Sequence, residues 1–127
     1  MQTECAQLGN LPMLRQAVTL LRGSGLQVWL FFQDASQLRH CYPDDWQTFV
    51  NNSGVVQAFG FTNHTMAREW SEILGVGHQQ LAELRREDAV VMRQGHGSQV
   101  CRRPDYLKDS MFSGLFDANP RFGLQGP

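Results

Sequence analysis

The most prominent apolar run of the chain covers residues 26–32 and is followed at once by the polar pair Gln33 and Asp34. Glycines at positions 23 and 25 precede the run and indicate a turn. A nearly continuous apolar run of this length is typical of a strand that is buried on both faces, as central strands of parallel sheets are. Ligands of open α/β sheets collect at the carboxyl ends of the strands, which makes Gln33 and Asp34 candidate functional residues.

A second, shorter run, residues 55–59, is rich in β-branched and aromatic residues and predicts another strand. Three helices are expected before it. The first covers residues 11–22 with Pro12 in its first turn, the second covers residues 36–42 and is ended by Pro43, and the third begins at Asp44 or Asp45. Gly23 or Gly25 is expected to end the first helix in a left-handed conformation. Connections of this length allow a crossover, so the two strands are predicted to run parallel.

The second half of the chain predicts a long helix, a short helix and a hairpin. Apolar residues recur at helical spacing from position 66 to Leu74, with Thr62 as the expected N-cap and Gly75 as the expected end. Residues 79–86 predict a short helix, and residues 89–94 and 99–102 predict two strands joined by a glycine turn. From Pro104 the pattern is irregular, and five apolar residues are expected to dock against the body: Tyr106, Met111, Phe112, Leu115 and Phe116.

Composition narrows the functional classes. With 127 residues, 42% hydrophobic content and a net charge of -1, the chain has the properties of one small domain without a bulk attraction to nucleic acid or to acidic membranes. No apolar run approaches the roughly 20 residues of a membrane-spanning helix. The odd cysteine number without a CxxC pair indicates reduced thiols and a cytosolic setting. The scattered histidines lack metal-ligand spacing, so no zinc site is expected.

Known catalytic motifs are missing from the sequence. There is no GxxxxGK[ST] phosphate loop, and no serine lies in a GxSxG turn. His40 and Cys41 are neighbours on a predicted helix, where their side chains point about 100° apart and cannot form a nucleophile and base pair. The arginine pairs at positions 85–86 and 102–103 are expected to be solvated surface residues.

Several blocks together resemble the TraG/TraD family of type IV secretion coupling proteins, which are hexameric ATPases of bacterial conjugation. The blocks read QTECAQLG at 2–9, LRGSG at 21–25, VWLFFQDASQL at 28–38, VVQAFG at 55–60, DAVVM at 88–92, RPDY at 103–106 and FDANP at 116–120. The resemblance covers essentially the whole chain. It implies an α/β fold that is the carboxyl-terminal half of a RecA-like P-loop motor domain, with a mostly parallel sheet, flanking helices and a C-terminal β-hairpin. Residues 1–103 would form this half and residues 104–127 a partly disordered extension.

The resemblance also assigns roles to four residues. Glu4 stands where the family has the glutamate that polarises the attacking water, but Thr3 replaces the aspartate that orients Mg²⁺. Arg22 matches the arginine finger that stabilises charge on a neighbouring subunit's ATP. Gln33 matches the glutamine that senses the γ-phosphate. ATP and Mg²⁺ are the cofactors of the intact family, and none is expected to bind tightly to this chain.

The family's membrane anchor, its phosphate loop and its helical insertion have no counterpart in this sequence. In RecA-like sheets the strand that feeds the phosphate loop lies between the strands that correspond to residues 26–33 and 55–59. Its loss would leave two apolar strand edges unpaired, which favours aggregation or non-native pairing. Loss of the strand before Thr3 would expose a further edge.

The chain is therefore expected to be the carboxyl-terminal part of a conjugative coupling ATPase from a truncated or interrupted reading frame. The intact protein would deliver a DNA–relaxase substrate to the secretion channel from the cytoplasmic face of the inner membrane, with the relaxosome, single-stranded DNA and other subunits as partners. The chain alone is expected to be cytoplasmic and not to hydrolyse ATP. Two alternatives stay open: an interaction module that docks on full-length subunits of the hexameric ring, and a decayed remnant without function.

Overall fold

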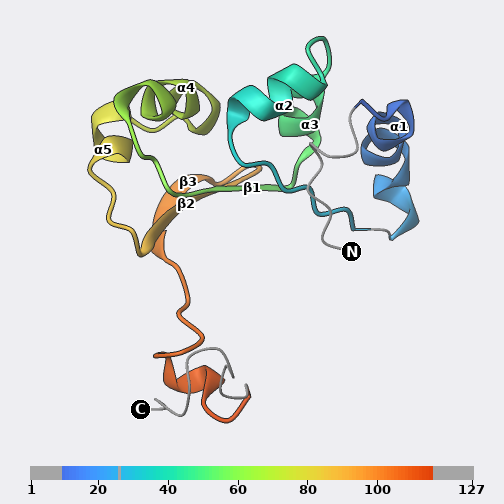
Figure 1. Cartoon of the computed structure of the whole chain (residues 1–127). Helices are drawn as coiled ribbons and strands as arrows, with labels where there is room; N and C mark the ends of the chain where they lie inside the picture. The colour runs from blue at the N-terminus through green and yellow to red at the C-terminus, as the bar shows by residue number, and fades with distance from the viewer. Residues whose placement is uncertain (1–9, 26, 116–127) are drawn as a thin grey trace.

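The structure is a computed structural model, and it describes residues 10–25 and 27–115. The five α-helices lie along one side of an extended layer that contains the sheet, and the carboxyl-terminal segment hangs below this body (Figure 1). Two buried clusters divide the body into a helical half and a sheet half. The hollow between these halves positions the candidate site.

The helical half consists of α1 (Pro12–Leu20), the 3-10 helix η2 (Leu21–Ser24), α2 (Ala35–Cys41), α3 (Trp46–Asn52) and the extended residues 27–33. Its buried core is Leu38, Tyr42 and Phe49, and the rings of Tyr42 and Phe49 lie with centroids 4.5 Å apart. The Tyr42 hydroxyl accepts a hydrogen bond from the Leu11 backbone N–H at 3.3 Å, which ties the start of α1 to this core. α1 itself contains no buried residue.

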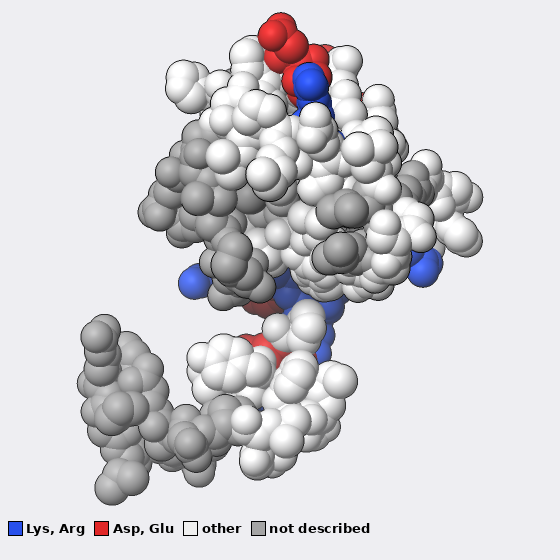
Figure 2. Space-filling view, turned by 90° about the vertical axis from the view of Figure 1, so that its right-hand side faces the viewer, with Lys and Arg blue, Asp and Glu red and all other residues white. Residues whose placement is uncertain are grey.

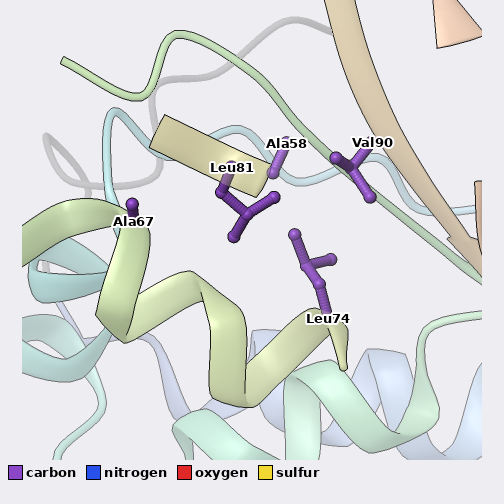
Figure 3. Close-up of a cluster of buried hydrophobic side chains, with 5 residues drawn as sticks. All are labelled: Ala58, Ala67, Leu74, Leu81 and Val90. Atoms are coloured by element: carbon purple, nitrogen blue, oxygen red, sulfur yellow. The ribbon is translucent and has the colours of Figure 1, made fainter. Parts of the chain in front are cut away.

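The sheet half contains β1 (Val55–Ala58), β2 (Asp88–Arg93) and β3 (Gly97–Arg102) in the order β1-β2-β3, with both pairs antiparallel. α4 (His64–Leu74) and α5 (His78–Ala82) pack on this sheet. Figure 3 shows the buried side chains converging between the helices and the strands: Ala58, Ala67, Leu74, Leu81 and Val90. The predicted hairpin is confirmed, because β2 and β3 pair along their whole lengths across the turn at residues 94–96.

Most helix ends lie where the capping residues of the sequence predict them, and one predicted N-cap is wrong. Asp34 caps α2 through a hydrogen bond from the Gln37 N–H, and Gly75 ends α4 with a left-handed φ of 65°. Gly25, with φ 73°, follows η2 as expected. The predicted N-cap Thr62 is wrong: Asn63 caps α4, since its side chain accepts the Met66 N–H at 2.8 Å.

The predicted burial of residues 26–33 is not found. Residues 27–33 are extended but form only a single bridge, at Phe31, and Trp29 is 72% exposed. Residues 55–59 are also not a sheet interior, because β1 is an edge strand of the described sheet and pairs antiparallel with β2. A strand is buried on both faces and both edges only when neighbours flank it, and the described residues supply none between these two segments. The mostly parallel RecA-like sheet stays a prediction.

The carboxyl-terminal segment, residues 104–115, contains the short 3-10 helix η3 (Ser110–Phe112). The expectation that its apolar residues dock against the body is wrong for Tyr106, Met111 and Leu115, which are exposed in a segment that projects away from the body (Figure 1), whereas Phe112 is half-buried. An ion pair between Arg102 Nη2 and Asp109 Oδ1 at 2.6 Å ties the segment to β3. An ion pair therefore attaches this segment to β3, where apolar contacts with the body were expected. Phe116 lies outside the described residues.

Candidate functional site

A hollow of about 210 Å³ separates residues 30–33 from β1. We call this hollow the strand groove. It is lined mainly by apolar side chains from the extended segment, α2, α3, β1 and α4: Leu30, Phe32, Leu38, Phe49, Val50, Val55, Val56, Ala58, Phe59, Met66 and Trp70. The polar lining residues are Gln33, Ser53 and Gln57, and no charged side chain contributes. Because small-molecule sites measure roughly 300–1,000 Å³ and binding of a nucleotide needs cationic groups, the groove does not have the properties of a nucleotide site.

Gln33 lies at the end of the extended segment and lines this groove. Its backbone N–H donates to Gln37 Oε1 at 2.9 Å, and its own side chain is exposed. The next residue, Asp34, accepts hydrogen bonds at Oδ1 from the Ser36 hydroxyl and the Gln37 N–H, both at 2.7 Å. These donors lower the pKa of Asp34, with the Ser36 hydroxyl as the largest cause. Gln33 is thus held by a capped turn, with an exposed side chain at the end of the groove.

The other predicted site residues are not brought together by the described structure. Glu4 and Thr3 lie outside the described residues. Arg22 lies in η2, between α1 and the extended segment, and only its backbone is described. The assignments of Glu4 as catalytic glutamate, Arg22 as arginine finger and Gln33 as phosphate sensor therefore stay predictions.

A polar bridge links the two halves beside the groove. Arg39 on α2 forms an ion pair with Glu69 on α4, with Nη1 and Oε1 2.7 Å apart. The same guanidinium lies 4.4 Å from the centroid of the Trp46 ring, a favourable cation–π geometry. Its Nε is buried and has no hydrogen-bond partner within the described residues. Arg39 therefore links the helical and sheet halves, and no sequence pattern had indicated this role.

Of the arginine pairs at positions 85–86 and 102–103, Arg85, Arg86 and Arg102 are exposed as expected, but Arg85, Arg102 and Arg103 also form contacts within the chain. Arg85 binds both carboxylate oxygens of Asp88, through Nε at 3.0 Å and Nη2 at 3.1 Å. Arg103 donates from Nη2 to the Arg86 carbonyl at 2.6 Å, and its guanidinium lies 4.6 Å from the Phe59 ring centroid. Figure 2 shows basic and acidic residues gathered where the body meets the carboxyl-terminal segment.

This charged junction could have been found from the hairpin itself. An antiparallel hairpin places the residues before its first strand beside those after its second, and Arg103 indeed donates to the Arg86 carbonyl. The hydrogen bonds from Arg85 lower the pKa of Asp88, and those from Arg102 lower the pKa of Asp109. Because the guanidinium groups of Arg85, Arg102 and Arg103 already bind carboxylates or a carbonyl, they stabilise the chain rather than present a vacant phosphate site.

Metal and thiol chemistry find no support in the part of the chain that is described. Across residues 10–25 and 27–115 there is no group of three or more His, Cys, Asp or Glu side chains that could hold a metal ion. Cys41 and Cys101 are free thiols, and Cys5 lies outside the described residues. Within the same described ranges, no helix is long and apolar enough to cross a bilayer.

Comparison with known proteins gives one match. The model of a family described as the TraM recognition site of TraD and TraG matches residues 2–103. These residues include every element from α1 to β3 and end where the carboxyl-terminal segment begins. No curated protein and no solved structure matches the chain.

Proposed function

This chain belongs to the TraG/TraD family, whose matching region is the TraM recognition site, and we propose that it is the part of a conjugative coupling protein that binds a TraM-type protein of the relaxosome. The single observation that carries this function is the family match over residues 2–103, about four fifths of the chain. It agrees with the resemblance found in the sequence. The binding surface is therefore expected on the body formed by α1 to β3, not on residues 104–115.

The wider role proposed for the intact protein is delivery of a DNA–relaxase substrate to a type IV secretion channel. In that role the protein would work as a hexamer at the cytoplasmic face of the inner membrane and would use ATP and Mg²⁺. Support comes from the sequence blocks around Arg22 and Gln33 and from the family match that contains both residues.

The fold proposed for the intact protein is a RecA-like domain of which this chain is the carboxyl-terminal half. The strand groove supports this interpretation, because its two walls are extended segments and its lining is apolar, as a position for one further central strand would be. In the intact domain the strand that feeds the phosphate loop would occupy the groove and bring ATP beside Gln33. Since the sequence has no GxxxxGK[ST], we expect no ATP hydrolysis by the chain alone.

Binding to a TraM-type protein can be measured directly with the purified chain. Titration of the 127-residue chain with purified TraM protein, followed by calorimetry, is expected to give saturable binding. Hydrogen exchange of the complex should then show new protection within residues 10–103. A Leu115→Ala variant, changed outside the matched region, is the control and should bind as well as the wild type.

Two results would contradict this function. One is the absence of binding to TraM by a chain whose circular dichroism shows it folded. The other is protection confined to residues 104–115 together with weaker binding of Leu115→Ala. ATP turnover by the purified chain above that of a Glu4→Gln variant would separately overturn the expectation that the chain is inactive alone.

A further inference from the structure

The sheet has one face that no described helix covers. Side chains of a strand alternate between the two faces of a sheet, and residues directly opposite each other in the register share a face. Val56, Ala58 and Val90 point into the core beneath α4 and α5, so the odd-numbered positions of the three strands point the other way. The described α-helices lie on the side of this core (Figure 1). The uncovered face, which we call the open face, consists of Val55, Gln57, Ala89, Val91, Arg93, Gly97, Gln99 and Cys101.

The open face is accessible to solvent and carries little charge. Val55 is 58% exposed, and Gln57, Gln99 and Cys101 are exposed as well. Of the eight positions of this face one, Arg93, is charged, whereas α4 on the other side of the sheet has three charged residues among its 11. Interfaces between proteins have few charged residues at their centre and are enriched in arginine. The open face therefore has the composition of an interface rather than that of an ordinary solvated surface.

Arg93 places one positive charge at the end of the open face that is next to the hairpin turn. It is exposed, it lies opposite Val55 in the register, and it forms no ion pair with any described residue. Four other arginines of the described chain each pair with an aspartate or a glutamate. A charge at the rim of an interface favours partners of opposite charge and speeds their association. The open face therefore fits a partner surface that is largely uncharged and has a carboxylate opposite Arg93.

We propose that the TraM-type protein docks on the open face, through an uncharged surface with an acidic group opposite Arg93. This inference rests on the proposed function, because the family match that names TraM covers residues 2–103 and thus all three strands. It narrows the binding surface from the body as a whole to one face of the sheet. α4 and α5 support the sheet from behind and do not contact the partner. Because the strands are already paired, the face keeps its shape on binding and little conformational entropy is lost.

The test is calorimetric titration of variants of the full chain with purified TraM protein. Arg93→Glu and Gln99→Glu each make the open face more negative at an exposed position, and each is expected to raise the dissociation constant at least about tenfold. The matched controls make the same two changes at exposed positions of the helices, Arg68→Glu on α4 and Gln80→Glu on α5. They should bind as the wild type does. Circular dichroism checks that all four variants are folded.

A second measurement uses the wild type and so does not depend on the variants folding. Cys101 is an exposed thiol on the open face, and Cys41 is a half-buried thiol in the helical half. Alkylation with iodoacetamide, followed residue by residue by mass spectrometry, should be slower at Cys101 in the TraM complex than in the chain alone. The alkylation rate of Cys41 should not change.

The outcomes separate this docking site from the proposed function. Binding of TraM that Arg93→Glu and Gln99→Glu leave unchanged, or alkylation of Cys101 that TraM does not slow, would overturn the docking site and leave the function standing. Protection of Cys101 that grows with the concentration of the chain alone, without further change on adding TraM, would assign the open face to a second copy and also overturn the proposal. Absence of TraM binding by the folded wild type would overturn both.

Discussion

The sheet half and the helical half of this molecule differ in how their extended segments are paired. In the sheet half, β2 has a neighbour on each side, and Val90 at its centre is fully buried under α4 and α5. In the helical half, residues 27–33 have a single bridge, and Trp29 points its ring into solvent. The two segments are similarly apolar in sequence, so hydrophobicity does not explain the difference.

The comparison shows that an apolar segment is buried only where the fold supplies a neighbouring strand for it. β2 finds β3 through a turn at residues 94–96, so its pairing needs only local chain. Residues 27–33 are followed by two helices before the next strand, and the position between them and β1 is hollow. Closing a non-local pair costs more chain entropy than closing a hairpin.

The largest expected effects come from the two cores. Phe49→Ala in the helical half should cost about 3–5 kcal/mol and Leu81→Ala in the sheet half about 2–5 kcal/mol, because each side chain is buried. Since few contacts join the halves, we expect each substitution to reduce amide protection mainly in its own half, as measured by hydrogen exchange. Leu20→Ala, at an exposed position, is the control and should stay within about 0.5 kcal/mol of the wild type. Equal loss of protection in both halves would instead make them one cooperative unit.

Helix caps give the next largest effects, and each half has one. Asp34→Ala should destabilise the helical half and Asn63→Ala the sheet half by about 0.5–2 kcal/mol, since each side chain accepts a backbone N–H at the start of a helix. Urea denaturation provides the measurement. Thr62→Ala is the matched control for α4, because Thr62 precedes the observed cap. A loss for Thr62→Ala equal to that for Asn63→Ala would show that the cap has been assigned to the wrong residue.

The bridge between the halves should contribute less. Glu69→Gln removes the charge that pairs with Arg39, and because both side chains are partly exposed we expect a loss of only about 0.2–1 kcal/mol. The loss should shrink at high salt, as solvent-screened ion pairs do. Glu72→Gln, at an exposed position on the same helix, serves as the control. A loss of several kcal/mol in the free energy of unfolding that salt does not change would mean that the Arg39–Glu69 ion pair behaves as a buried pair and not as a solvent-exposed one.

Acid should weaken the charged junction of the sheet half. The pKa of Asp88 is lowered in the folded chain by its hydrogen bonds from Arg85, so its contribution to stability is present above the ordinary aspartate pKa of about 3.9 and is lost as the pH falls through the lowered value. The free energy of unfolding of wild type should therefore fall below about pH 4. In Asp88→Asn this fall should be smaller, whereas Asp44→Asn in the turn before α3 should leave it unchanged. An identical acid profile for Asp88→Asn and wild type would remove this role for Asp88.

Much of the local structure was predictable from the sequence because its causes are local. Asp34 and Pro43 bracket α2, Gly75 ends α4, and the glycine turn sets the hairpin register. The family resemblance is also confirmed by the match over residues 2–103. Gln33 was predicted at the end of an extended segment and does line the groove, although its role as a phosphate sensor stays a prediction.

What the tertiary structure alone decided concerns contacts between distant segments. The pattern of residues 26–32 indicates a buried strand but does not say whether its neighbours are present, and in the described structure they are not. In the same way, Arg39 and Arg103 have the pattern of ordinary surface residues until folding brings Glu69 and Phe59 to them. Periodicity and caps are properties of neighbours along the chain. Burial and ion pairing depend on which segments the fold brings together.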